Sequence, residues 1–333
     1  MFPWVAGGLA LWAGVLWALA NGFFESFVDV TRKQGASHFD DWSSAWGMRF
    51  YATLFLLPLA YVMRPHSFPH HPSFWWATAG SVAINTYTSM LYMRAIRRSD
   101  ISLVLPVTTL SPVFMVGTAR FITGEALSPL GILGIVVSCA GIYTLSFRQL
   151  PKGLFAPFLD LWKASERRPW FYVRSLQAVP LGLMQPFLVL WKDPDLRSML
   201  YVAILWSISA PIEKVAIVHG DPYWFAGLVN AGLVMSLTFF LFRYGKPRHT
   251  LSLVGFRWLA PVGLFVAASA FCQYKAIGLM FVPYAIGLKR TSVLWGVVWG
   301  KLKFKEGEFG LRLTAAILTV IGTGLIIVTQ TKR

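Results

Sequence analysis

Residues 90–145 read MLYMRAIRRSDISLVLPVTTLSPVFMVGTARFITGEALSPLGILGIVVSCAGIYTL, and this pattern recurs 181 positions further along the chain. The matching positions are Arg94-Ala95-Ile96 with Lys275-Ala276-Ile277, Ser111 with Ser292, Glu125 with Glu306, and Gly141 with Gly322. Apolar runs align with one another by chance, but charges, glycines and a shared triplet rarely do so together. Because Leu16-Trp17 also matches Leu205-Trp206 at an offset of 189, we infer an internal repeat covering both halves.

The composition around this repeat is that of an integral membrane protein. The 333 residues are 56% hydrophobic and 13% charged, whereas soluble domains are about 45–50% apolar and about 25% charged. Ten apolar runs have about the 20-residue length that crosses a bilayer as a helix. These expected spans are about 5–28, 43–63, 73–93, 101–121, 127–147, 199–219, 222–243, 253–275, 281–300 and 310–329.

Five spans per copy determine how the two copies are related. Because five is odd, the second copy must enter the membrane from the opposite side, which makes the copies inverted repeats. We therefore predict an all-α integral membrane fold of ten transmembrane helices in two inverted five-helix repeats, residues 1–147 and 199–333. The basic segment 148–198 links them, and its proline-broken apolar stretch 178–191 is interpreted as interfacial or re-entrant.

The chain resembles the EamA-like branch of the drug/metabolite transporter superfamily. Shared elements are a Tyr before the basic-Ala-Ile end of span three, Ser111-Pro112-Val113-Phe114 in span four, and Gly124-Glu125 before span five. Met48-Arg49-Phe50 resembles the family's second span, and YAIGLKRTSVLWGVVWGKLKFKE (284–306) its ninth. The resemblance implies alternating access around a cavity lined mainly by spans 1, 3, 4, 6, 8 and 9. It says little about the substrate.

Lys289 and Arg290 are the sharpest candidates for substrate binding. They lie about nine residues into an expected span, so they cannot easily reach both interfaces. Arg at such a site binds carboxylate or phosphate in a bidentate manner. Adjacent helical positions point about 100° apart, so we expect only one of the two to face the cavity. The alternative is an internal salt bridge to Glu213 or Glu25 without substrate contact.

Ionisable residues in spans one and six are further candidates, because a charge at the bilayer centre costs about 2.5–3.5 kcal/mol or more. Asn21 and Glu25 stand four residues apart and so share a helix face. Glu213 and Lys214 follow Pro211, which we expect to break the helix and expose backbone groups to a site. Glu25 or Glu213 would bind a substrate amine or carry a coupling proton. Alternatively, Glu25 only meets lipid headgroups.

Aromatic residues complete the expected substrate site, since aromatic rings can wall a cavity for amphiphilic or cationic solutes. They are Trp17, Tyr92, Trp206, Tyr274 and Tyr284. The same residues are equally consistent with packing.

Other polar and glycine positions are expected to be structural. We expect Glu125 and Glu306 to cap the next helix or pair with a loop Arg. Glycines of spans five and nine are expected at close helix contacts: Gly131, Gly134, Gly141, Gly296 and Gly300. The histidines at 66, 70 and 71 have no carboxylate or Cys neighbour at ligand spacing, so no metal or other cofactor is expected.

The net charge of +16 comes from Lys and Arg in short loops. Basic residues in such loops usually set the orientation of the protein in the membrane and contact anionic lipids, so nucleic-acid binding is not expected. The odd-numbered loops carry most of it, which would place them in the cytoplasm and both termini outside. The family resemblance instead implies cytoplasmic termini. The orientation and the oligomeric state, including a homodimer, therefore stay open.

Together, these observations predict a secondary transporter of small polar organic metabolites, an exporter by resemblance, with coupling to protons or to exchange left open. The resemblance places it in a bacterial cytoplasmic membrane. One alternative is a flippase for a lipid-linked phosphate or glycolipid, in which the same basic pair would bind phosphate. Another is a non-transporting sensor or enzyme, but no acid/base constellation in the spans suggests one.

Overall fold

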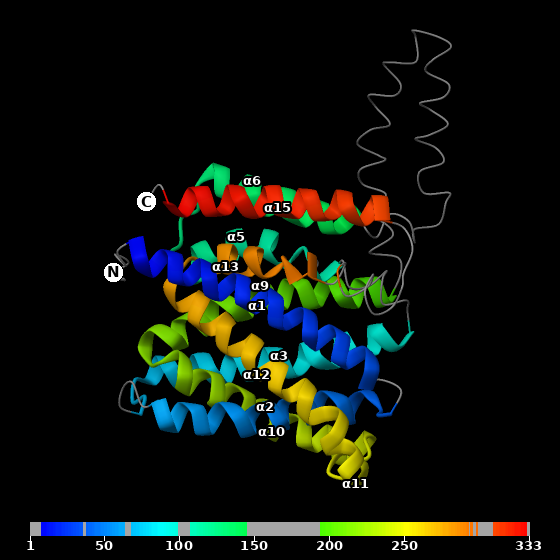
Figure 1. The fold of residues 1–333 in the computed structure, drawn as a ribbon. Coiled ribbons are helices and arrows are strands. Elements are labelled where there is room, and N and C mark those ends of the chain that lie inside the picture. Colours follow the sequence, from blue (N-terminus) through cyan, green and yellow to red (C-terminus); the bar gives the residue numbers. More distant parts are fainter. Residues whose placement is uncertain are drawn as a thin grey trace, which may run out of the picture.

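The computed structural model describes residues 8–35, 38–63, 68–98, 107–144, 194–292, 294–295, 298 and 309–331. Within these residues every regular element is an α-helix. The helices, labelled as in Figure 1, are α1 (Gly8–Gly35), α2 (Asp41–Met63), α3 (Pro72–Arg98), α5 (Ser111–Ile122), α6 (Pro129–Thr144), α9 (Pro194–His219), α10 (Pro222–Tyr244), α11 (Pro247–Thr250), α12 (Leu253–Leu279), α13 (Val282–Lys289) and α15 (Phe309–Thr331).

Every helix except the single turn α11 overlaps one of the ten expected spans. Four of the described helices, α2, α9, α10 and α12, are long and apolar enough to cross a membrane. Shorter apolar stretches lie in α6 and α15, at Pro129–Gly141 and Ile317–Thr329. The all-helical class is thus confirmed, and ten membrane crossings stay a prediction. Helix α9 starts at Pro194, earlier than the expected span 199–219, and the stretch 178–191 lies outside the described residues.

The surface of the bundle is strongly apolar. Side chains such as Trp76, Met235 and Leu253 are 80%, 78% and 83% exposed. Exposed apolar area on this scale is not tolerated by a soluble monomer, but a bilayer covers it. The surface therefore agrees with an integral membrane protein.

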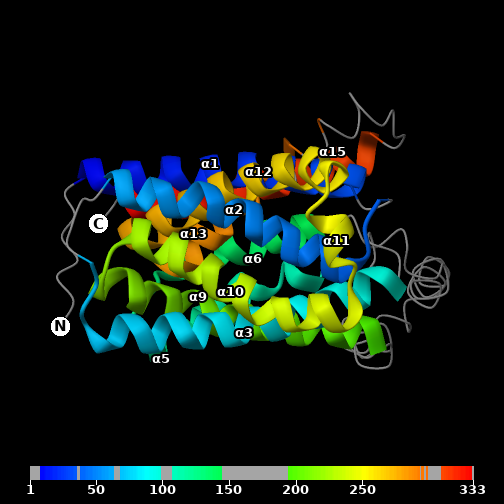
Figure 2. The same cartoon turned by 90° about the horizontal axis from the view of Figure 1, so that it is seen from below.

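The helices pack in pairs that each join the first half of the chain to the second. α1 lies on α12, α3 on α9, α2 on α10, α5 on α13 and α6 on α15. In Figure 1 the α6–α15 pair forms one edge of the molecule and the α2–α10 pair lies toward the opposite edge, and in Figure 2, seen from below, α2 and α10 lie nearer the viewer than α6. In the expected repeats α1 corresponds to α9, α2 to α10, α3 to α12, α5 to α13 and α6 to α15. Exchanging every helix for its counterpart leaves this set of pairs unchanged.

Glycines permit two of the closest helix contacts. A Cβ atom on Gly322 of α15 would lie 2.5 Å from the Gly134 carbonyl oxygen of α6. A Cβ atom on Gly131 would overlap the Tyr284 ring. The span-five glycines at 131 and 134 therefore lie at close contacts, as expected, whereas Gly296 and Gly300 lie outside the described residues.

Local signals account for several helix limits. The Asp221 carboxylate accepts the Tyr223 N–H at 2.7 Å and so caps α10, with Pro222 at the first helical position. Pro211 does not break α9, which continues to His219. The expected break at this proline was therefore wrong, because a packed helix in a bundle tolerates the loss of one backbone hydrogen bond.

Candidate substrate-binding site

Lys289 and Arg290, at the end of α13, point toward different helices. The Lys289 ammonium lies 3.2 Å from the Glu25 carboxylate of α1 and donates to Gln273 of α12 at 3.0 Å. The Arg290 guanidinium instead donates to the Ser111 hydroxyl at 2.8 Å and to the Thr108 carbonyl at 3.1 Å, at the start of α5. The two neighbours thus diverge, as their helical spacing predicts, and Lys289 forms the internal salt bridge that was the alternative to substrate contact.

The Glu25–Lys289 pair belongs to a polar cluster between α1 and α12. The Ser269 hydroxyl lies 2.9 Å from the Asn21 side-chain oxygen and 2.5 Å from a Glu25 oxygen. Asn21 is buried, whereas the side chains of Glu25 and Lys289 are 27% and 19% exposed. The ion pair of this cluster is therefore partly exposed, and Glu25 does not merely face headgroups.

The cluster lies well inside the bundle. Gln273 and Ser269 are about 9 and 15 Å before the C-terminal end of α12, whose 27 residues extend about 40 Å at 1.5 Å per residue. Sequence reasoning missed both of them. Their signal was present, since Ser and Gln four residues apart on one face interrupt an apolar span.

Arg290 differs from Lys289 because it has no carboxylate within ion-pair distance in the described part of the chain. Its Nε is buried and has no hydrogen-bond partner there. Glu25 and Asp29 act on it only through longer-range electrostatic attraction. A guanidinium with an unfilled donor can bind a planar anion such as a carboxylate or a phosphate.

Glu213 lies in a second polar cluster, between α3 and α9. Its Oε1 accepts hydrogen bonds from Ser81 at 3.0 Å, Ser209 at 3.1 Å and Asn85 at 3.2 Å. The side chain is only 5% exposed. Glu213 is thus held apart from the Glu25–Lys289 cluster, and the three residues that hold it were not foreseen.

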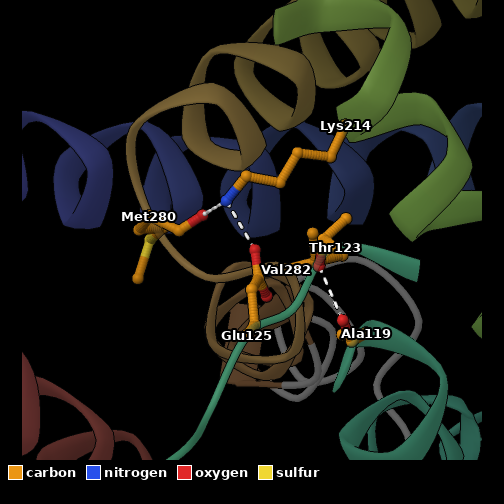
Figure 3. A network of polar contacts seen from close by, with 6 residues as sticks. All are labelled: Ala119, Thr123, Glu125, Lys214, Met280 and Val282. Atoms are coloured by element: carbon orange, nitrogen blue, oxygen red, sulfur yellow. Dashed lines mark hydrogen bonds and ion pairs between the residues drawn. The ribbon is translucent and has the colours of Figure 1, made fainter. Parts of the chain in front are cut away.

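Lys214 is fully engaged in a buried ion pair, which Figure 3 shows. Its ammonium lies 2.6 Å from Glu125 Oε1 and donates to the Met280 carbonyl at 2.8 Å, and both charged side chains are 1% exposed. Glu125 Oε2 accepts the Val282 N–H at 2.8 Å. These contacts fasten α9, the α5–α6 connection and the α12–α13 connection together, and they favour a structural role for Lys214 over substrate binding.

Glu125 is structural, as expected, but its partners are different. It satisfies a free N–H at the start of α13 rather than capping α6, and its cation is Lys214 rather than a loop Arg. The sequence did not predict these partners because Lys214 and Val282 are 89 and 157 positions away from Glu125. Glu306 lies outside the described residues.

The five aromatic candidates mostly pack. Tyr274 and Tyr284 are buried in the largest apolar core, and Trp17 packs against that core. Trp206 donates to the Thr88 hydroxyl at 3.2 Å and its ring lies 5.8 Å from that of Tyr92. The Tyr284 hydroxyl accepts the Ser128 N–H at 3.1 Å. The structure does not bring these rings together around Lys289 and Arg290.

Other features of the described residues stand apart from these clusters. No group of three His, Cys, Asp or Glu side chains is placed there to hold a metal ion. A groove of about 650 Å³ lies between α3 and α10. Apolar side chains dominate its lining, which includes none of the candidate substrate residues.

Comparison with known proteins supports the resemblance drawn from the sequence. Residues 12–147 match the model of the EamA-like transporter family. No curated protein is detectably similar to the chain. A solved structure described as "Crystal structure of protein" superposes with a TM-score of 0.67 at 16% identity, over 94% of this chain and 95% of that one. That likeness concerns the fold alone.

The family match covers α2, α3, α5 and α6 and all of α1 except its first turn. It agrees with the apolar, all-helical bundle and with the polar clusters set inside it. Residues 12–147 are therefore similar to the EamA-like transporter family, and the apolar helices identify the chain as an integral membrane protein.

Proposed function

We propose that this protein is a secondary transporter, an exporter of small polar organic metabolites with an acidic group, acting by alternating access. The observation that carries the proposal is the Arg290 guanidinium, whose buried Nε has no hydrogen-bond partner and which has no carboxylate counter-ion among the described residues. It lies beside the Glu25–Lys289 ion pair, at a depth typical of transporter sites.

The Glu25–Lys289 ion pair and the neighbouring Arg290 together suggest how a substrate would bind. The acidic group of the substrate would be held by Arg290 and would compete with Glu25 for the Lys289 ammonium. A zwitterionic substrate could then offer its own amine to the released Glu25 carboxylate. One internal ion pair would be replaced by two with the substrate, so an amino-acid-like zwitterion fits better than a neutral solute.

Alternating access is supported by the arrangement of the helices. The cross-half pairs keep their pattern when expected repeat partners are exchanged, as two inverted repeats related by a pseudo-two-fold axis would require. The Lys214–Glu125 pair is buried, whereas the Glu25–Lys289 pair is partly exposed. We take the described form to be closed at the Lys214–Glu125 pair and open toward the Glu25–Lys289 pair. The membrane in which it acts would be a bacterial cytoplasmic membrane.

A screen for ligands tests this proposal. The purified protein is heated with anionic, zwitterionic, cationic and neutral metabolites, since a ligand of the native state raises its apparent stability. Stabilisation by acidic or zwitterionic compounds is expected, with loss of that shift in Lys289→Gln/Arg290→Gln. Arg243→Gln, an exposed cation at the end of α10, is the matched control. Full stabilisation of the double variant would overturn the proposal.

A further inference from the structure

Glu213 has an incomplete set of partners. All three hydrogen bonds that the described residues give its carboxyl group go to Oε1, from Ser81, Ser209 and Asn85. Oε2 is buried and has no hydrogen-bond partner among those residues. One oxygen of a carboxyl group that is 5% exposed is thus left without a ligand.

The nearby cations are already committed. Lys214, next in the chain, is paired with Glu125, and Lys289 is paired with Glu25. Among the described residues, Tyr274 of α12 and, more remotely, Lys289 interact electrostatically with Glu213; Arg49 of α2 acts on the same Tyr274 but donates its hydrogen bond to Asn230 of α10. α3 contributes only the neutral Ser81 and Asn85 at this point. An ionised Glu213 would therefore be a buried charge without a counter-ion, which is strongly unfavourable.

The free oxygen fits a proton better than a metal cation. A hard metal cation takes six or more oxygen ligands, whereas a proton needs the single lone pair that Oε2 offers. Asn85 also directs its amide N–H toward the carboxyl group, which disfavours a cation in the same place. The three donors on Oε1 would stabilise the carboxylate once the proton has left.

We infer that Glu213 is a proton-binding site that couples substrate movement to proton movement, an inference that rests on the proposed transport function. Oε2 takes a proton from water when the α3–α9 interface is open to one side and returns it to water on the other. The protonated form is the one that can be buried when α3 and α9 close upon it. The proton site is separate from the Arg290 anion site, because its ligands come from α3 and α9.

Infrared difference spectroscopy tests the proton site without any organic ligand. The protein is titrated with acid and base in a supported lipid film, and the carbonyl stretch of a protonated buried carboxyl group is followed. The band is expected in the wild type, is lost in Glu213→Gln, and is retained in Asp195→Asn, a matched change at the other end of α9. Ser81→Ala, which removes one donor, shifts the band without abolishing it.

Three results would overturn the proton site. They are the absence of a titrating band in the wild type, an unchanged band in Glu213→Gln, and loss of the band when sodium is added at constant pH, which would mean that a metal cation competes for the carboxyl group. Because the measurement uses only protons and sodium, it stands whatever the ligand screen returns. If a substrate has been found, a pH gradient across proteoliposomes should drive its accumulation in the wild type. Glu213→Gln should retain exchange and lose that accumulation, whereas accumulation equal to the wild type would refute coupling.

Discussion

Replacing Lys214 by methionine would leave Glu125 buried without its cation. The two side chains are 1% exposed and 2.6 Å apart, and Glu125 also holds the Val282 N–H. Breaking a buried ion pair from one side costs about 3–5 kcal/mol, because the remaining charge is uncompensated. We expect Lys214→Met to lower the free energy of unfolding by that amount.

Substituting Glu125 as well separates two effects: the loss of the attraction between Lys214 and Glu125, and the cost of leaving the Glu125 charge buried without a cation. Glu125→Gln keeps an oxygen for the Val282 N–H and removes the negative charge, so Lys214→Met/Glu125→Gln should cost far less than the sum of the single changes. A coupling energy of about 2–3 kcal/mol is expected. Lys246→Met, an exposed lysine before α11, should change stability by less than about 0.5 kcal/mol.

The assay is reversible unfolding in mixed detergent micelles, followed by tryptophan fluorescence, for the two single variants, the double variant and the control. The account fails if Lys214→Met costs less than about 1 kcal/mol, or if the two single changes simply add. Either result would mean that the pair is solvated in the membrane-embedded protein and fastens nothing.

Two further changes address packing and specificity. Gly322→Leu should destabilise the protein by at least about 1–3 kcal/mol in the same assay, because its side chain would collide with the α6 backbone, whereas Gly324→Leu, which meets no atom within 4 Å, should be tolerated. Equal effects of the two leucines would argue against the α6–α15 contact. Glu25→Gln frees Lys289, so purely anionic ligands should bind more tightly and zwitterionic ligands more weakly, by about tenfold for each 1.4 kcal/mol, measured by titration calorimetry. Unchanged selectivity would remove Glu25 from the site.

Much of the architecture was readable because it depends on local pattern. Apolar runs located the helices within a few residues, and the glycines of span five marked a close contact because only a missing side chain allows one. The start of α9 was expected too late in the chain, since polar Asp195 and Arg197 lie inside the helix and interrupt its apolar pattern in the first turn.

The polar clusters were harder to foresee because their partners are remote in sequence. Glu25 and Lys289 stood out as charges in apolar runs, but Ser269 and Gln273 are ordinary residues until the fold places them beside that pair. Lys214 was judged by its position in a span, and only the folded chain shows that Glu125 occupies it. The aromatic candidates failed to gather because a ring in an apolar span packs equally well anywhere in the core.

Counterflow in proteoliposomes tests the central claim most directly. Vesicles preloaded with a stabilising ligand from the screen are diluted into a trace of the same labelled compound, without any ion gradient. The account predicts transient accumulation of label by the wild type, its loss in Arg290→Gln, and its retention in Arg243→Gln. Absence of counterflow in the wild type, or counterflow in Arg290→Gln equal to the wild type, would contradict a carrier with Arg290 at its substrate site.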